Sequence, residues 1–281
     1  SRSSAASDVY KRQALGSKWD VEIKELNQQA RVILRVNTLK TTKQELQKIL
    51  RDEEIDTEVI PKYPDALVLV ERKNVFLTQA FKKGLFEVQD ASSQLVAPFL
   101  DVRPGQKVVD TCAGAGGKTL HLASLMENKG QIIAMDIHAH KLAELKKRAK
   151  RDGAHNIETR PIEGTKAIKK LKGKADRVLI DAPCSGLGVL KRNPDSKWKL
   201  NPEFIERIKK TQAEILDQYS SMLKSGGKLV YATCSILPSE NELQVKAFLK
   251  NHSEFTLIKD KKVSPAASGF DGFYMALMEK K

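Results

Sequence analysis

Two cysteines follow predicted buried strands and are the residues of this sequence best placed for covalent chemistry. Cys184 ends the sequence RVLIDAPC, and Cys234 ends the sequence KLVYATC. If the two strands are neighbours in a parallel sheet, both thiols lie at the carboxyl ends of strands, where ligands gather. Packing in the core would explain either cysteine alone, whereas matching positions at two strand ends favour a reactive pair.

A glycine-rich loop lies between a predicted strand at 107–110 and a predicted helix at 117–127. Its sequence, TCAGAGGKT, places glycines where the backbone must approach a ligand at a strand-to-helix turn. The loop misses two phosphate-binding motifs by one position each. The dinucleotide pattern needs glycine where Thr119 stands, and the P-loop needs glycine where Cys112 stands. The loop therefore predicts a nucleotide-like ligand and leaves its type open.

Two acidic residues at the ends of the next predicted strands indicate which type of ligand the loop binds. Asp136 ends the second strand of the sheet, where a carboxylate can bind both ribose hydroxyls of an adenosine-containing cofactor. Capping of the helix that begins near His138 is the alternative role, and Asp136 could fill both. Glu163 follows the third strand and could accept a hydrogen bond from an adenine amino group. A surface glutamate is an equal alternative there.

An adenosine cofactor, an acid, two thiols and a basic face suit one reaction on a pyrimidine ring. The carbon C5 of cytosine is a poor nucleophile, but addition of a thiolate at C6 converts the ring to an enamine whose C5 can attack an electrophilic methyl group. An acid at N3 supports the addition, because negative charge would otherwise accumulate on the ring. A second thiol nearby could assist release of the first.

Strands and helices alternate after Ala91, which is typical of an α/β fold with a parallel sheet. The apolar pattern predicts strands at 107–110, 131–136, 157–162, 177–181, 228–232, 255–259 and 272–278. It predicts helices at 117–127, 138–151, 202–223 and 239–250. The last helix has a capping-box pattern from Ser239 to Glu242. These elements make up a domain from residue 91 to residue 281.

Residues 17–90 predict a smaller α+β unit, and residues 1–16 are expected to be a tail that need not be native. The unit has apolar residues at helical spacing (Trp19, Ile23, Leu26), an alternating strand pattern (Val32, Leu34, Val36) and a capping box (Thr42, Glu45). Its residues Arg31, Arg35 and Lys40 beside Asn37 suit contacts with phosphates. A solvated sheet face is the equal alternative.

The composition favours a polyanionic partner. Lys and Arg number 49 against 35 Asp and Glu among 281 residues, a formal net charge of +14. The three cysteines fit neither a disulfide framework nor a zinc site, so we expect free thiols, no metal and a reducing, cytoplasmic setting. No apolar stretch is long enough to cross a membrane, and we expect a monomer without a membrane partner.

Six segments together resemble the RNA cytosine-5 methyltransferases of the RsmB/NOP2/NSUN group, and most of all its bacterial 16S ribosomal RNA members. They are FEVQDASSQLV, DTCAGAGGKT, DAPCSGLG, RNPD, YATCS and DGFYMALMEK, and the resemblance covers about residue 30 to the end. It implies a class I methyltransferase domain with a doubly wound, Rossmann-like mixed sheet, behind a small α+β RNA-recognition subdomain. It also implies S-adenosylmethionine as cofactor and RNA as partner, ribosomal RNA being favoured over transfer RNA.

The resemblance implies a role for each site residue. The cysteine after the Thr of the strand-five motif is the nucleophile in that family, which implies this role for Cys234. Cys184 is implied to aid product release, and Asp181 to bind the cytosine edge and touch the cofactor. Lys118 would orient carboxylates. Contacts with S-adenosylmethionine are implied for Cys112, Ala113, Gly114, Ala115, Gly116, Gly117, Lys118, Asp136, Glu163 and Asp181.

The chain departs from the family pattern in two places. The family commonly has CAAPGGKT where this chain has CAGAGGKT, so proline rigidity is replaced by Gly114 and Ala115, and we expect a more flexible loop. Glu163 stands where the family usually has Asp. Bacterial members often carry a further helical RNA-binding domain in front, and the chain is expected to begin too late to include it. The basic RNPD loop is expected to form a wall on the substrate side.

Three other functions compete with this interpretation. A P-loop ATPase would explain the glycine loop and the VLID strand, but it leaves Asp136 and both strand-end thiols unexplained. A DNA cytosine-5 methyltransferase can use the Pro-Cys thiol as nucleophile, so Cys184 would replace Cys234. An RNA-binding assembly factor without catalysis would not need the complete set of Asp181, Cys184 and Cys234.

Overall fold

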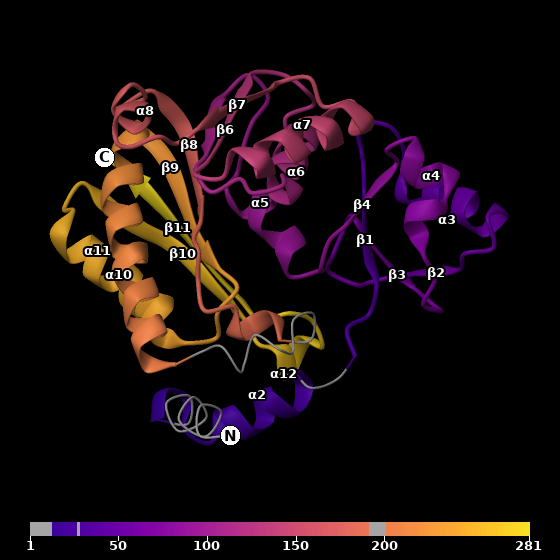
Figure 1. The fold of residues 1–281 in the computed structure, drawn as a ribbon, viewed down its shortest axis with the longest axis horizontal. Coiled ribbons are helices and arrows are strands. Elements are labelled where there is room, and N and C mark those ends of the chain that lie inside the picture. The colour runs from indigo at the N-terminus through magenta and orange to yellow at the C-terminus, as the bar shows by residue number, and fades with distance from the viewer. Residues whose placement is uncertain (1–12, 27–28, 191–200) are drawn as a thin grey trace.

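The computed structural model describes residues 13–26, 29–190 and 201–281. The predicted substrate-side loop with Asn193, Pro194 and Asp195 lies outside the described residues. The described part forms a small antiparallel sheet and a larger mixed sheet, each with its own helices (Figure 1). None of the helices in these described ranges is long and apolar enough to span a bilayer.

The small sheet has the strand order β2-β3-β1-β4, with every pair antiparallel. Its strands are β1 (Ile33–Val36), β2 (Thr57–Val59), β3 (Ala66–Leu69) and β4 (Phe86–Val88). The helices α3 (Lys43–Asp52) and α4 (Gln79–Lys82) cover one face, at the right of Figure 1. The predicted cap of α3 is confirmed, because the Thr42 side chain accepts a hydrogen bond from the Glu45 amide.

The expectation that β1 is half-buried is wrong, because all four of its residues are buried. Leu34 and Val36 pack under the helices. Ile33 points to the opposite face and packs in a second cluster that includes Phe270, which comes from the far end of the chain. The small sheet is therefore covered on both faces, the second one by a segment that joins the larger sheet.

The large sheet has the strand order β10-β11-β9-β8-β5-β6-β7, and the predicted doubly wound mixed sheet is confirmed. Its strands are β5 (Lys107–Asp110), β6 (Gln131–Asp136), β7 (Ile157–Pro161), β8 (Ala175–Asp181), β9 (Leu223–Thr233), β10 (Phe255–Val263) and β11 (Phe273–Lys280). The strands β5 to β9 are parallel, and β11 and β10 extend the sheet antiparallel. Strand order reverses between β5 and β8, so ligands are expected at the carboxyl ends of these two strands.

Helices cover both faces of the large sheet (Figure 1). One face carries α5 (Val96–Phe99), α6 (Gly117–Leu125) and α7 (Ala139–Asp152), and the other carries α8 (Lys166–Lys169), α10 (Pro202–Tyr219) and α11 (Glu242–Asn251). Asn201 caps α10, which ends at Tyr219 rather than at 223 because a 3-10 turn at Ser220–Met222 leads directly into β9.

The predicted capping box from Ser239 to Glu242 is wrong. Ser239 lies in a 3-10 turn, Pro238–Glu240, and Asn241 stands at the N-cap of α11 without a side-chain cap. The Asn241 side chain instead bonds with the Thr233 hydroxyl and the Ser235 carbonyl. The segment before α11 is therefore tied to the end of β9.

The helix α2 (Lys18–Leu26) precedes the small sheet in sequence but packs beside the large one. Trp19 is buried in a cluster with Leu187, Ile205 and Leu237. The helix also lies against α12 (Pro265–Ser268), seen at the bottom of Figure 1, where the Ala266 amide donates to the Glu22 carboxylate at 3.1 Å. The segments that follow β8 and β9 are thus covered by α2.

Candidate active site

The two cysteines meet, as the strand pattern predicted. The strands β8 and β9 are neighbours, with Asp181 in register with Ala232. Each strand is followed within three residues by its cysteine, and the Sγ atoms of Cys184 and Cys234 lie 3.0 Å apart. Both thiols are half-buried and free. The two sulfur atoms therefore lie at hydrogen-bonding distance from each other.

Cys184 is a weakly acidic thiol. The pKa of Cys184 is raised well above its ordinary value, first by its hydrogen bond with Cys234 and then by burial. Cys184 is thus held as a protonated thiol beside the other sulfur, where its S–H can serve as a donor. Burial also raises the pKa of Cys112, which packs against the core and is not a candidate nucleophile.

An ion pair stands next to the thiols. The Nζ atom of Lys118, on the first turn of α6, lies 2.6 Å from Oδ2 of Asp181 at the end of β8. Burial alone would lower the pKa of Lys118, but the Asp181 carboxylate, with a further contribution from Cys234, raises it above the ordinary value. The ammonium also lies 5.2 Å from the centre of the Phe273 ring. The site therefore keeps a fixed positive charge among a carboxylate and two sulfur atoms.

A buried carboxylate that sequence analysis missed, that of Glu240, binds the residues after both cysteines. Its Oε1 accepts from the Ser185 amide at 2.7 Å, and its Oε2 accepts from the Ser185 hydroxyl at 2.7 Å and from the Ser235 hydroxyl. Gln212, from α10, donates to Oε1 at 3.1 Å. Glu240 is 0% exposed. One side chain thus holds the Cys184 and Cys234 loops at a fixed separation. The Cys-Ser dipeptide, which occurs in both loops, is the sequence pattern that could have indicated a shared partner.

The two cysteine loops also lie close to the segment that contains Gly272, and this close approach requires a glycine at position 188. The Gly188 amide donates to the Cys234 carbonyl at 2.8 Å, and the Gly272 amide donates to the Gly188 carbonyl at 2.7 Å. A Cβ atom on Gly188 would lie 2.2 Å from the Gly272 oxygen and 2.6 Å from the Cys234 oxygen. Only glycine lets these backbones come so close.

Asp136 lies at the end of β6 and organises the glycine loop. Its Oδ2 accepts from the Gly114 amide and its Oδ1 from the His138 amide, both at 2.8 Å. The carboxylate thus serves the start of α7, as the alternative interpretation expected. An ionised carboxylate has about four lone-pair sites, so two remain for ribose hydroxyls. A Cβ placed on Gly114 would meet no atom within 4 Å, so there is open space beside this backbone.

The glycine loop is anchored by two arginines. Arg35 of β1 donates to the Gly117 carbonyl at 2.7 Å, and Arg148 of α7 donates to the Ala115 carbonyl at 2.8 Å. Gly116 caps α6 with φ +100°, and a Cβ there would lie 2.5 Å from Leu145. The first amides of an α-helix have no carbonyl partner within the helix, so the start of α6 suits an anionic ligand group.

The expectation that Arg35 and Asn37 contact phosphates is wrong, because both are buried. Arg35 is 1% exposed and also donates to Gln89 at 2.6 Å. Asn37 donates to the carbonyls of Gly84 and Asp152. These residues join the small subdomain to the large one, since the second face of the small sheet is not solvated. Arg31 remains exposed.

Two residues mark the region expected for adenine. Glu163 is exposed just beyond β7, in a shallow pocket of about 570 Å³ with Arg160, Lys166 and Lys170. Its contact with adenine stays a prediction. Ile137, which the sequence analysis missed, directly follows Asp136 and is 65% exposed. An exposed isoleucine next to the acid at a strand end offers an apolar surface for a planar ring. Its position between the polar residues Asp136 and His138 is the sequence pattern that could have identified it.

Two family models match the chain. The model of the 16S rRNA methyltransferase RsmB/F family matches residues 97–279. The model of the ferredoxin-like domain of RsmF/B-like methyltransferases matches residues 11–76. Together they cover the large sheet and most of the small one.

Individual proteins agree with these models. The chain is 35% identical over 266 residues to the probable ribosomal RNA small subunit methyltransferase B of Bacillus subtilis, covering 88% of this chain and 59% of that protein. A methyltransferase homolog protein from Pyrococcus horikoshii superimposes with a TM-score of 0.85 at 28% identity, covering 96% and 93% of the two chains. NSun6 from Pyrococcus horikoshii with SFG shares the fold, with a TM-score of 0.87, 22% identity and 96% of both chains covered.

The chain spans about three fifths of the length of the curated relatives it matches, 59% and 64% for two of them. The family expected from the sequence segments is confirmed over the part that is present. By the match of the family model to residues 97–279, this chain belongs to the 16S rRNA methyltransferase RsmB/F family.

Proposed function

We propose that this protein transfers a methyl group from S-adenosylmethionine to C5 of a cytosine in RNA, with ribosomal RNA as the substrate class. The reaction proceeds through a covalent bond between Cys234 Sγ and C6 of the base. The observation that carries the proposal is the pair of thiols 3.0 Å apart beside the Lys118–Asp181 ion pair. This set occurs where the strand order reverses, next to the glycine loop.

The residues present fit the methyl donor. Asp136 would bind the ribose hydroxyls with its remaining lone pairs, and the start of α6 would bind the carboxylate. Residues Cys112 to Lys118 would line the donor, with Ile137 and Glu163 at the adenine and Asp181 near the reacting end. S-adenosylmethionine bound there would supply an electrophilic methyl carbon to C5 of the activated ring and would leave as S-adenosylhomocysteine.

The addition step uses Cys234 and the ion pair. The Cys234 thiolate forms a bond to C6, and the electron pair of the C5–C6 double bond moves toward C5 and the N3 side of the ring. The Asp181 carboxylate would accept a hydrogen bond from the N4 amino group of the cytosine. Lys118 would offset the negative charge that develops on the ring, because its raised pKa keeps it protonated.

Release reverses the addition. After methylation the proton on C5 passes to a base, the C5–C6 double bond forms again, and the bond between C6 and Cys234 Sγ breaks. Cys184, held protonated beside that sulfur, would donate its S–H to the departing thiolate. This role suits a thiol with a raised pKa, whereas a nucleophile needs a thiolate. The resemblance to the family assigns the nucleophile to Cys234 rather than to Cys184, which is the nucleophile of the alternative DNA-type mechanism.

The substrate class rests on charge and on relatives. A formal net charge of +14 favours a polyanion. Curated relatives that are 35% and 36% identical carry the name ribosomal RNA small subunit methyltransferase B. Nucleotide binding by a P-loop ATPase would leave the paired thiols without a purpose, and a factor without catalysis would not need them.

The test is a methyl-transfer assay followed by identification of the product. The protein is incubated with labelled S-adenosylmethionine and RNA from cells that lack the modification, and the RNA is digested to nucleosides. We expect label in 5-methylcytidine. Label in another nucleoside, or in cytosine of DNA only, would contradict the proposal.

A further inference from the structure

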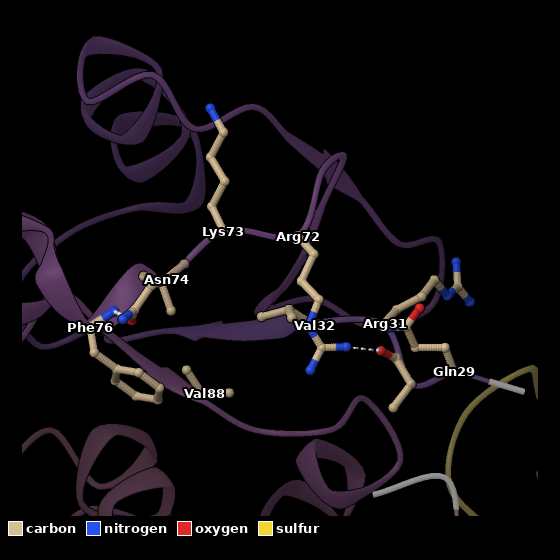
Figure 2. Close-up of a pocket in the computed structure, with 10 residues that line it drawn as sticks. Gln29, Arg31, Val32, Arg72, Lys73, Asn74, Phe76 and Val88 are labelled. Atoms are coloured by element: carbon tan, nitrogen blue, oxygen red, sulfur yellow. Dashed lines mark hydrogen bonds between the residues drawn. The ribbon is translucent and has the colours of Figure 1, made fainter.

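A pocket of about 570 Å³ lies on the small subdomain, away from the thiols (Figure 2). It is lined by Gln29, Ala30, Arg31, Val32, Arg72, Lys73, Asn74, Val75, Phe76 and Val88. The lining comes from the residues before and at the start of β1, the loop after β3 and the end of β4. Its volume is typical of sites that hold small molecules or single nucleotides.

The charged residues of the pocket are all basic. Three of the ten lining residues are cations and none is an acid. The guanidinium of Arg72 points into the pocket, where it donates to the Ala30 carbonyl at a long 3.5 Å (Figure 2). Lys73 points outward to the Glu54 carbonyl. Arg72 can therefore reorient toward an anion at little cost, because a bond of that length is weak.

The apolar residues of the pocket include an exposed aromatic ring. Phe76 is 54% exposed. Its ring packs nearly perpendicular to the ring of Phe81, with the ring centres 5.0 Å apart, and the Asn74 side chain accepts from the Phe76 amide at 3.1 Å. Val88 lies beside the ring (Figure 2). A ring held in this way and open to solvent is a surface on which a base can stack.

The pocket is linked to the candidate active site by two short stretches of chain. Val88 is followed by Gln89, which bonds with Arg35, and Arg35 in turn holds the Gly117 carbonyl of the glycine loop. The Arg31 guanidinium lies 4.8 Å from the Phe270 ring, three residues before the Phe273 that lies under Lys118. The Arg31 edge of the pocket therefore lies beside the segment 270–273, which also borders the candidate active site.

We propose that this pocket binds a single-stranded nucleotide that flanks the target cytosine in the substrate RNA. Arg72 binds a backbone phosphate, Arg31 adds positive charge at the rim, and a base stacks on Phe76. The absence of acids from the lining and the pairing of a cation with an exposed ring favour RNA over an apolar or basic peptide. The inference rests on the proposed function for the identity of the RNA.

The test measures binding of a short, labelled, single-stranded RNA to the whole chain by fluorescence anisotropy. Phe76→Leu keeps the apolar volume and removes the aromatic face, and we expect affinity to fall by about 5-fold or more. Phe76→Trp should restore binding. Arg72→Gln should weaken binding and lower the slope of log K against log salt by about 0.7.

Two matched controls separate this site from general effects. Leu77→Ala changes the neighbouring residue, which is 71% exposed and does not line the pocket. Arg103→Gln removes an exposed arginine near the opposite, amino end of β5. Both should bind RNA like the wild type. If Phe76→Leu and Arg72→Gln bind as tightly as these controls, the pocket is not an RNA site and a peptide occupant gains support.

Failure of the proposed function gives a different result. A wild-type chain that binds RNA without forming 5-methylcytidine would contradict the proposed reaction, while the order of affinities among the five variants would still decide whether the pocket binds RNA. If the Phe76→Leu variant loses RNA affinity but transfers methyl groups at the wild-type rate at saturating RNA, the result would support both the proposed reaction and the proposed RNA-binding pocket.

Discussion

The Sγ atoms of Cys184 and Cys234 lie 3.0 Å apart, although the residues are fifty positions apart in sequence. Two features of the backbone produce this contact: adjacent parallel strands that end at the same level, and the bonds from Ser185 and Ser235 to one carboxylate. The separation is short enough for one sulfur to donate a proton to the other. It therefore matches a reaction in which one thiol bonds to the base and the other helps to free it.

The first prediction concerns Glu240, the positioning residue for both thiols. Glu240→Gln places an amide N–H₂ opposite donors from Ser185, Ser235 and Gln212, so at least one bond is lost. We expect kcat to fall by about 10-fold or more, because small displacements of reacting groups are costly. The KM for RNA should change little. Steady-state kinetics of methyl transfer measures both values.

A variant close in sequence controls for a general loss of folding. Glu242, two residues later, is half-buried, pairs with Lys262 and contacts neither cysteine loop, so Glu242→Gln should keep wild-type kcat. Glu240→Asp, which retains the charge, should recover part of the rate. A Glu240→Gln enzyme with normal kcat would show that the carboxylate does not set the separation of the thiols.

The second prediction concerns Arg148, which anchors the glycine loop. Arg148→Met removes the donor to the Ala115 carbonyl and leaves Arg151 to pair with Glu87. Because a typical hydrogen bond contributes about 1 kcal/mol, affinity for S-adenosylmethionine should fall roughly 2- to 10-fold. Isothermal titration calorimetry measures this affinity. RNA affinity should stay near that of the wild type, and an equal loss of both affinities would argue against a local effect.

The third prediction concerns the dependence of stability on pH at Asp110. Burial raises the pKa of this carboxyl from 3.8 to about 7, against a smaller effect of the Thr119 hydroxyl. The folded protein thus retains a proton that the unfolded chain releases between these pH values. The contribution of Asp110 to stability is full below about pH 4 and is lost as pH rises through about 7.

Asp110→Asn removes this dependence. The free energy of unfolding of the variant should therefore rise relative to the wild type between pH 4 and 8, by up to about 4 kcal/mol. Urea denaturation at several pH values measures the difference. Asp176→Asn should give the opposite slope, because the bonds from Lys224 and the Lys107 amide hold the pKa of Asp176 below its ordinary value despite its partial burial. Parallel pH profiles for the wild type and Asp110→Asn would contradict the assigned titration.

The inner strands β5, β6 and β8 could be predicted because buried parallel strands are continuous apolar runs. The predicted ends of β5 and β6 agree with the structure. The strand β9 begins at Leu223, five residues before the predicted start, because its first half, LKSGG, has no apolar pattern and is fixed by pairing with β8. The meeting of the two thiols followed from strand adjacency alone.

Residues whose environment depends on distant parts of the chain could not be predicted. Arg35 lies in a strand whose second face is covered by a cluster with Phe270, and no local pattern shows that covering. Glu240 lies in the turn before α11, where a capping pattern is the simpler interpretation, although it is Asn241 that stands at the cap position. Its partners Ser185 and Gln212 become neighbours only in the folded sheet.

The most direct test of the central claim is a trapped covalent intermediate. Wild type, Cys234→Ala and Cys184→Ala are each incubated with S-adenosylmethionine and radiolabelled substrate RNA, then separated on a denaturing protein gel. We predict that Cys184→Ala accumulates a band of protein bound to RNA, because the adduct forms and cannot be released. Cys234→Ala should give neither the band nor methylated RNA. A Cys234→Ala enzyme that still methylates RNA, with activity lost in Cys184→Ala, would contradict the assignment of Cys234 as the nucleophile.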